Sequence, residues 1–562
     1  MWKCACILLL CLCAVESRFF VNDTELGTIQ GMKADDGDYV MFLGIPYAKV
    51  NASNPFGASV PYSKYDNIFK AFDGTVVCPQ IDEFSNMYAG TLDCLRLNVY
   101  VPNTGSQNKA VVIYIHGGAF RQGNGGKHVL GPEYIVRHDV IVVTFNYRLG
   151  PYGFLCTNSP ELPGNQGLKD QYMAMKWVKK NIHAFGGSPE RITLMGHSAG
   201  SMCVDMHLLA TQRRLYQQAI LQSGAATTPG QLMYPDDAPT LEVARSLGLN
   251  ATDVSKAVAL LASTDPKSVI SASMSNEYTF CVEKEHNNVF GYITEHPEKS
   301  KASNVNGLNI LSGVTDNEFL FALYGSAGIG KFNNSKLFRQ NLEYVFDLEN
   351  IEEVATIVQH FYLGDGQNDF TNRYKVVDYL SDCLFLYPMQ RALNKYSQHN
   401  NATVYFYVFS YDGNRNFFKS MYNVTESGAA HADELGYLFH GEIVKTIPTP
   451  QDVTMVDKIS MLWTNFIKYG NPTPETNRLI PVIWPPMVGT NSSLRGLQID
   501  KHLEVISRPF HSRMAFWELL YNTYEGRLKT ALSTNSSTSL ITYKSFLYIV
   551  LNVIYFVYYI FT

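Results

Sequence analysis

The chain has 562 residues, of which 46% are hydrophobic, 13% aromatic and 17% charged, and its formal net charge is −5. Such a composition is typical of a globular protein with a large core and excludes extensive disorder. The sequence has no basic stripe that could neutralise phosphate groups, so no nucleic-acid partner is expected.

The N-terminus has the layout of a secretory signal peptide. Residues 1–20 read MWKCACILLLCLCAVESRFF, with one lysine, an apolar stretch of about ten residues and then small residues. The apolar stretch is too short for a membrane span, which takes about twenty residues. We therefore expect residues 1–17 to be removed and the chain to enter the secretory pathway.

Acceptor sites for N-glycosylation fit the same destination. Each lies in an Asn-x-Ser/Thr sequence whose middle residue is not proline. The sites expected to carry glycans are Asn22, Asn51, Asn250, Asn333, Asn401, Asn423 and Asn491. A further acceptor, Asn535, lies in a C-terminal segment that is expected to be trimmed.

Removal of residues 1–17 leaves six of the ten cysteines. They are Cys78, Cys94, Cys156, Cys203, Cys281 and Cys383. Cys78 and Cys94 enclose a short loop and are the best candidates for a disulfide in an oxidising compartment. Closing a loop of about fifteen residues contributes about 3 kcal/mol when the effect is treated as chain entropy. The other four cysteines stay unassigned.

Apolar, β-branched runs alternate with helical stretches along the chain. Between two of the runs, residues 169–185 carry apolar side chains at helical spacing, which predicts a helix packed on a sheet. The alternation predicts an α/β fold with a mostly parallel central sheet and helices on both faces. No repeat or linker divides residues 18–532, so a single domain is expected there. The predicted strands are 111–115, 140–145, 192–195, 308–314 and 404–409.

Residues 114–120 read YIHGGAF and close the first of these strands in a Gly-Gly turn. Glycines at such a turn let backbone N–H groups come close to a ligand. With the N–H of Ala199, those of Gly117 and Gly118 could form an oxyanion hole, which stabilises the charge that grows on a carbonyl oxygen. The motif alone would also fit an ordinary turn at a strand end.

The most informative motif is ITLMGHSAGS at residues 192–201. An apolar run that meets small residues around a serine is typical of a strand turning sharply into a helix, with the hydroxyl at the apex. Gly196 and Gly200 would remove the collisions that side chains two residues either side of Ser198 would cause. The pattern predicts a nucleophilic serine, although an ordinary Gly-Ser turn is the alternative.

A serine hydroxyl is a weak nucleophile at neutral pH, so a histidine must take its proton and a carboxylate must orient that histidine. His431 lies in GAAHADEL (428–435), between small residues and an apolar stretch. Glu318 lies in GVTDNEF (313–319), just past an apolar run. Ser198, Glu318 and His431 follow the chain order of the α/β-hydrolase triad. A packed loop histidine and a solvated carboxylate are the alternative interpretations.

The C-terminus carries a second predicted targeting signal. Residues 533–537 are small and polar, a short spacer follows, and residues 546–561 are almost wholly apolar. This order matches a GPI-attachment signal, which would place residues 533–562 in a removed tail and anchor the protein to the cell surface. A transmembrane helix is the alternative. The run is barely long enough for one, contains Asn552 and has no basic residues behind it.

Motifs from about Gly27 to Leu519 resemble the type B carboxylesterase and cholinesterase family. In chain order they are FLGIPYA (42–48), DCLRLNVYVP (93–102), IHGGAF (115–120), NYRLGPYGFL (146–155), PGNQGLKDQ (163–171), FGGSPERITLMGHSAG (185–200), QSG (222–224), GVTDNEF (313–319) and GAAHADELGYLF (428–439). The resemblance implies an α/β-hydrolase fold over the whole span.

The resemblance also implies roles for individual residues. By it, Ser198 is the nucleophile, Glu318 the triad acid and His431 the base. It likewise implies that Ser223 and Glu434 buttress the triad through hydrogen bonds. Gly117, Gly118 and Ala199 would be the oxyanion donors, with Cys78 paired to Cys94. Asp316 and Asp433 are the nearest rival carboxylates and do not match the family's acid position.

Departures from the family pattern narrow the substrate. Cholinesterases carry a tryptophan between the first paired cysteines that stacks on the choline ammonium, and residues 81–93 contain none. A main cation–π contact is therefore missing. His197 stands where insect juvenile hormone esterases have a glutamine, which argues weakly against that role. Members of the family often have a structural ion pair between an acid just before Asp93 and an arginine near Val60. Here Leu92 stands at the position of the acid, and the arginine is absent too.

The sequence as a whole predicts a serine carboxylesterase that hydrolyses small-molecule esters through an acyl-enzyme intermediate. This mechanism requires no metal or organic cofactor, and no metal-ligand motif such as His-Glu-x-x-His is present. A non-catalytic, cholinesterase-like adhesion protein is the alternative from another class, and the complete set of catalytic residues argues against it. A narrower alternative is an esterase dedicated to one hormone, pheromone or choline ester.

Overall fold

A computed structural model describes most of the chain between residues 19 and 529. The described ranges are 19–23, 26–287, 289–323, 336–366, 370–399, 401–487 and 494–529. The predicted signal peptide (1–17), the predicted GPI signal (533–562), Asn333 and Asn491 lie outside them. Within the described ranges, no helix has the length and apolar character needed to cross a membrane.

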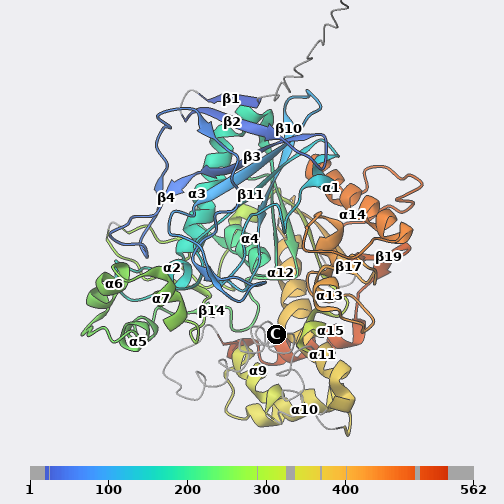
Figure 1. Ribbon diagram of the computed structural model, residues 1–562. Helices are drawn as coiled ribbons and strands as arrows, with labels where there is room; N and C mark the ends of the chain where they lie inside the picture. The colour runs from blue at the N-terminus through green and yellow to red at the C-terminus, as the bar shows by residue number, and fades with distance from the viewer. Residues whose placement is uncertain are drawn as a thin grey trace, which may run out of the picture.

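One large sheet runs through the molecule, with helices on both of its faces (Figure 1). The strand order is β1-β2-β3-β9-β11-β10-β12-β13-β16-β17-β18-β19, and β6 pairs with β2. From β11 to β18 every neighbouring pair is parallel, whereas β1, β2, β3, β9 and β19 are paired antiparallel. The predicted α/β fold with a mostly parallel central sheet is therefore confirmed.

The strands of this sheet are β1 (Phe19–Asp23), β2 (Gly27–Lys33), β3 (Tyr39–Pro46), β6 (Phe69–Lys70), β9 (Arg96–Pro102), β10 (Lys109–Ile115), β11 (Val140–Phe145), β12 (Gly187–His197), β13 (Gln218–Gln222), β16 (Asn309–Thr315), β17 (Thr403–Phe409), β18 (Arg495–Ile499) and β19 (Leu503–Ser507). Three small ribbons pair β4 (Ala48–Lys49) with β5 (Val60–Pro61), β7 (Gln80–Ile81) with β8 (Tyr88–Ala89), and β14 (Leu232–Met233) with β15 (Phe280–Cys281). Each predicted strand coincides with one of β10, β11, β12, β16 and β17.

The α-helices are α1 (Glu133–Val136), α2 (Gly150–Phe154), α3 (Gln166–Asn181), α4 (Ala199–Leu209), α5 (Ala238–Ser246), α6 (Val254–Ala262), α7 (Pro266–Ala272), α9 (Leu337–Val345), α10 (Ile351–Leu363), α11 (Arg373–Ser381), α12 (Tyr387–Ser397), α13 (Phe417–Tyr422), α14 (Pro450–Tyr469) and α15 (His511–Thr523). The helix predicted at 169–185 is α3 followed by a short 3-10 turn, Ile182–Phe185. It begins three residues earlier than expected.

The central strands divide the core into two layers. Along β10, Val111 and Ile113 join the cluster that contains α3 and α4, whereas Val112 and Tyr114 join the cluster that contains α14. Alternation of side chains across a strand explains this division. Because both faces are covered, every residue of β10 is buried. A strand buried on both faces reads as a continuous apolar run, which is the pattern that predicted it.

The described part of the chain contains two disulfides. The predicted Cys78–Cys94 bond is present. The structure adds Cys156–Cys281, which the sequence analysis left unassigned and which joins residues 125 positions apart. At Gly164, whose φ is +96°, a Cβ would lie 2.4 Å from the sulfur of Cys281, so glycine makes room for this bond. Cys203 and Cys383 are free and buried.

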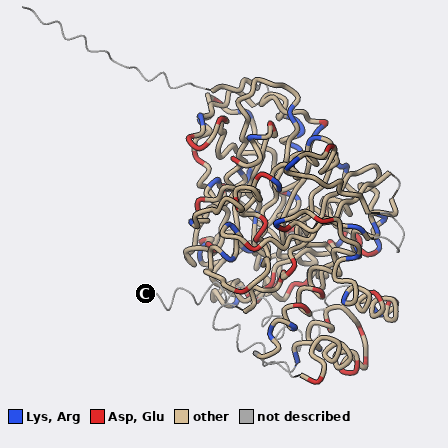
Figure 2. Tube along the Cα trace, turned by 90° about the vertical axis from the view of Figure 1, so that its right-hand side faces the viewer, with Lys and Arg blue, Asp and Glu red and all other residues tan. Residues whose placement is uncertain are grey.

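The surface of the described chain carries both signs of charge. Basic and acidic residues are interspersed along the trace in Figure 2. Five of the predicted glycosylation sites, Asn22, Asn51, Asn250, Asn401 and Asn423, are exposed. Their exposure leaves room for a glycan, and glycosylation itself stays a prediction.

Candidate active site

Ser198 occupies a sharp turn between β12 and α4. Its backbone has φ +57° and ψ −127°, a conformation that L-residues rarely adopt. A Cβ added at Gly196 would lie 2.3 Å from the carbonyl oxygen of Gly200, and one added at Gly200 would lie 2.1 Å from that of Ile115. Both glycines are therefore needed for the turn. The Ser198 N–H donates to the Gln222 carbonyl oxygen at 2.8 Å, which ties the turn to β13.

The Gly-Gly turn after β10 lies against this serine. A Cβ on Gly117 would be 3.1 Å from the Cβ of Ser198 and 2.8 Å from the carbonyl oxygen of His197. Gly118 has φ +109°, where glycine is favoured. Gly117, Gly118 and Ala199 line the same cavity as Ser198. The residues predicted as oxyanion donors are thus brought together around the serine.

Glu318 and His431 meet although they are 113 residues apart. The Nδ1 of His431 lies 2.6 Å from one carboxylate oxygen of the fully buried Glu318. The other oxygen accepts hydrogen bonds from the Ser223 hydroxyl at 2.6 Å and from the Thr315 N–H at 2.8 Å. These three hydrogen bonds engage both oxygens and hold the carboxylate in one orientation.

The other acidic residues near the site have different partners. Glu434 accepts from the Gln222 amide and the Tyr407 hydroxyl, each at 3.2 Å. Burial, together with the charge of Glu318, raises the pKa of Glu434 to about 7. The rival carboxylates bind the loop before His431 instead: Asp316 accepts from the Ala429 N–H and Asp433 from the Ala430 N–H.

His197, the residue before the serine, packs against His431. The two ring centroids are 4.5 Å apart. Burial lowers the pKa of His197 well below its usual range, so its ring is neutral at pH 7. The side chain that replaces the glutamine of juvenile hormone esterases is therefore an uncharged wall of the site.

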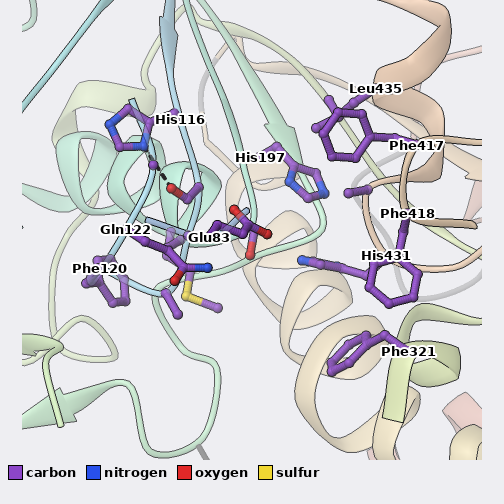
Figure 3. Close-up of a pocket in the computed structure, with 18 of the residues that line it drawn as sticks. Glu83, His116, Phe120, Gln122, His197, Phe321, Phe417, Phe418, His431 and Leu435 are labelled. Atoms are coloured by element: carbon purple, nitrogen blue, oxygen red, sulfur yellow. Dashed lines mark hydrogen bonds between the residues drawn. The ribbon is translucent and has the colours of Figure 1, made fainter. Parts of the chain in front are cut away.

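A cavity of about 260 Å³ opens in front of Ser198 and His431. Figure 3 shows His197 and His431 facing this space, with Phe321 and Phe418 beside His431. Seven phenylalanines line it, and none of the described lining residues is a tryptophan. The phenylalanines make the cavity suitable for an apolar substrate group. The tryptophan that binds the choline ammonium in cholinesterases has no counterpart among the described lining residues.

Sequence reasoning did not find several residues that line the cavity. Phe319 and Phe321 follow Glu318, Phe385 precedes α12, and Phe417 and Phe418 begin α13. No local pattern marks such residues, because their common feature is a shared cavity between distant segments. Glu83 and Gln122 also line it. Only its position inside the predicted Cys78–Cys94 loop could have indicated from the sequence that Glu83 lines the cavity.

Comparisons with a family model and with known proteins indicate the same family. A model of the carboxylesterase family matches residues 20–517. The chain is 33% identical to juvenile hormone esterase of Tribolium castaneum over 83% of this chain and 86% of the relative. It is 32% identical to bile salt-activated lipase of Rattus norvegicus over 89% and 85%.

A solved structure shows the same architecture. The juvenile hormone esterase of Manduca sexta, with OTFP covalently attached, superposes with a TM-score of 0.79 at 27% identity, covering 90% of this chain and all of that chain. The family match and these relatives show that this chain belongs to the carboxylesterase family and is a carboxylic ester hydrolase.

Proposed function

We propose that Ser198 is the nucleophile of a serine carboxylesterase, with His431 as general base and Glu318 as the acid that orients it. The observation that carries this proposal is the 2.6 Å contact between His431 Nδ1 and the buried Glu318 carboxylate, at a cavity that both His431 and Ser198 line. With Nδ1 engaged as a donor, the second ring nitrogen is left to accept the serine proton.

The reaction proceeds in two halves. Ser198 attacks the ester carbonyl as His431 takes its proton, and the N–H groups of Gly117, Gly118 and Ala199 stabilise the oxyanion. His431 then protonates the departing alcohol, which leaves an acyl group on Ser198. Water repeats the sequence on the acyl-enzyme and releases the acid. The seven phenylalanines favour esters with apolar acyl or alcohol groups.

Covalent labelling tests the nucleophile directly. We expect a fluorophosphonate to inactivate hydrolysis of p-nitrophenyl butyrate completely when one equivalent has reacted, because phosphonylation blocks the only proposed attacking oxygen. Peptide mass spectrometry should place the label on Ser198. A stoichiometric label on another residue, or full turnover by the labelled protein, would contradict the proposal.

We also propose that the mature protein is extracellular and anchored through a GPI group attached within residues 533–537. The small polar residues there and the apolar run behind them support this location. A phospholipase that cleaves GPI should release esterase activity from intact cells. Replacing residues 533–537 with bulky residues should abolish that surface pool, and activity that stays on the membrane after the enzyme treatment would favour a transmembrane tail.

A further inference from the structure

The Cys78–Cys94 loop supplies one wall of the catalytic cavity. Gln80 anchors it to the segment after the Gly-Gly turn: its side chain donates to the Gly123 carbonyl oxygen at 3.1 Å and accepts from the Gly123 N–H at 2.8 Å. Asp82 then fixes the following turn, because its carboxylate accepts from the N–H groups of Phe84 and Ser85. The loop therefore has a defined position.

Glu83 lies inside the turn that Asp82 fixes, and it lines the cavity. Its side chain is partly accessible, and it lines the same cavity as Ser198. Figure 3 shows Glu83 next to Gln122, across the pocket from Phe321 and Phe418. Gln122 lies beside Glu83 and lowers the pKa of its carboxyl group, which opposes part of the effect of burial. Glu83 and Gln122 thus lie in the wall of a cavity that seven phenylalanines also line.

The surroundings of Glu83 leave its charge uncompensated. Asp82 is the neighbouring carboxylate, Tyr422 faces Glu83 from α13, and no described residue lining the cavity is a lysine or arginine. Burial, with Asp82, raises the pKa of Glu83 to about 7. His116, His197 and His431 are the other titratable bases of the cavity. A carboxylate has room for about four hydrogen bonds, so Glu83 keeps acceptor capacity for a bound group.

We propose that Glu83, placed by the turn that Asp82 fixes, is a specificity-determining residue that selects esters carrying a hydrogen-bond donor in the acyl or alcohol chain. The inference rests on the proposed function. A hydroxyl or protonated amine on the substrate chain would donate a hydrogen bond to the Glu83 carboxylate. An alkyl chain in the same place would leave the carboxylate oxygens without that bond. A site built around such a group discriminates against substrates that lack it.

Matched esters test the proposal. The acyl series consists of p-nitrophenyl heptanoate, ω-hydroxyhexanoate and ω-aminohexanoate, and the alcohol series of heptyl, ω-hydroxyhexyl and ω-aminohexyl acetate. For each, the measurement is the ratio of kcat/KM for the donor ester to kcat/KM for the alkyl ester. Glu83→Gln removes the charge with little change of shape, and Glu83→Met removes the acceptor as well. Asp93→Asn is the control, because Asp93 lies on the same loop with an exposed side chain that pairs with Arg96.

We expect the ratio to fall at least about tenfold in the Glu83 variants in one series, since a hydrogen bond to a charged group contributes that much. The Asp93 control should keep the wild-type ratio. If the ratio falls in both Glu83 variants for the amino ester alone, the selected donor is cationic. If the ratio for the hydroxy ester falls in Glu83→Met, the selected donor is neutral. Ratios equal to wild type in both variants and both series would overturn the inference, while failure of the wild type to hydrolyse any ester would overturn the proposed function.

The wild-type protein offers a second measurement that needs no variant. The ionised Glu83 accepts from a donor and disfavours an alkyl chain, so the ratio should rise as pH increases through about 7, the pKa of Glu83. Any effect of pH that the two esters share cancels in the ratio. A ratio that stays constant or falls between pH 6 and about 8 would contradict the assignment.

Discussion

Replacing Ser198 with alanine is expected to lower kcat for p-nitrophenyl butyrate by about 10⁶-fold. The side chain removed is the only hydroxyl that the proposed mechanism uses for attack, and it sits at a turn that the two glycines shape for it. Residual hydrolysis of roughly 10³-fold over water would come from binding and the oxyanion donors alone. The measurement is a rate with and without enzyme, on protein freed of contaminating esterase.

A serine in the first turn of α4, just after Ser198, provides the control. Ser201 is buried, and its hydroxyl donates to the Gly224 carbonyl oxygen at 2.6 Å. Ser201→Ala therefore removes a buried hydrogen bond, which costs about 1 kcal/mol of stability, but leaves the reacting groups in place. Its kcat should stay within a few fold of wild type. Equal losses in the two variants would mean that the Ser198 effect is a folding defect.

Local sequence patterns predicted the strands and the turn whose conformation depends on neighbouring residues in the chain. The strand expected at residues 140–145 is β11 with the same bounds, because a strand covered on both faces has to be apolar throughout. The turn at Ser198 was predicted from its two glycines, and the distances at Gly196 and Gly200 give the steric reason. In both cases the residues of one short segment are enough to predict its conformation.

Features that depend on distant segments were not predictable in the same way. The partner of Cys156 lies 125 residues away, and four unassigned cysteines allow several pairings that spacing cannot separate. Glu83 became a cavity residue only because Gln80 and Asp82 place the loop across the pocket. Glu318 and His431 were chosen with the help of the family resemblance, since chain order alone left other acids and histidines open.

Replacing Glu318 with glutamine is expected to lower kcat by about 10⁴-fold while leaving the cavity intact. The reason is the direction of the hydrogen bonds. The Thr315 N–H can only donate, so the amide oxygen of glutamine must take the position it faces, and the amide NH₂ then points at His431. An NH₂ facing Nδ1 forces that nitrogen to accept, and the ring proton moves to the nitrogen that should receive the proton of Ser198.

This explanation predicts more than a loss of rate. KM should change little, because Glu318 is fully buried and makes its contacts with His431, Ser223 and Thr315. Ser223→Ala should cost far less than Glu318→Gln, since it removes one donor without reversing the tautomer of His431. The double variant Ser198→Ala/Glu318→Gln should be no slower than Ser198→Ala, because groups that act as one unit are not additive. A Glu318→Gln protein within tenfold of wild type would show that another group orients His431.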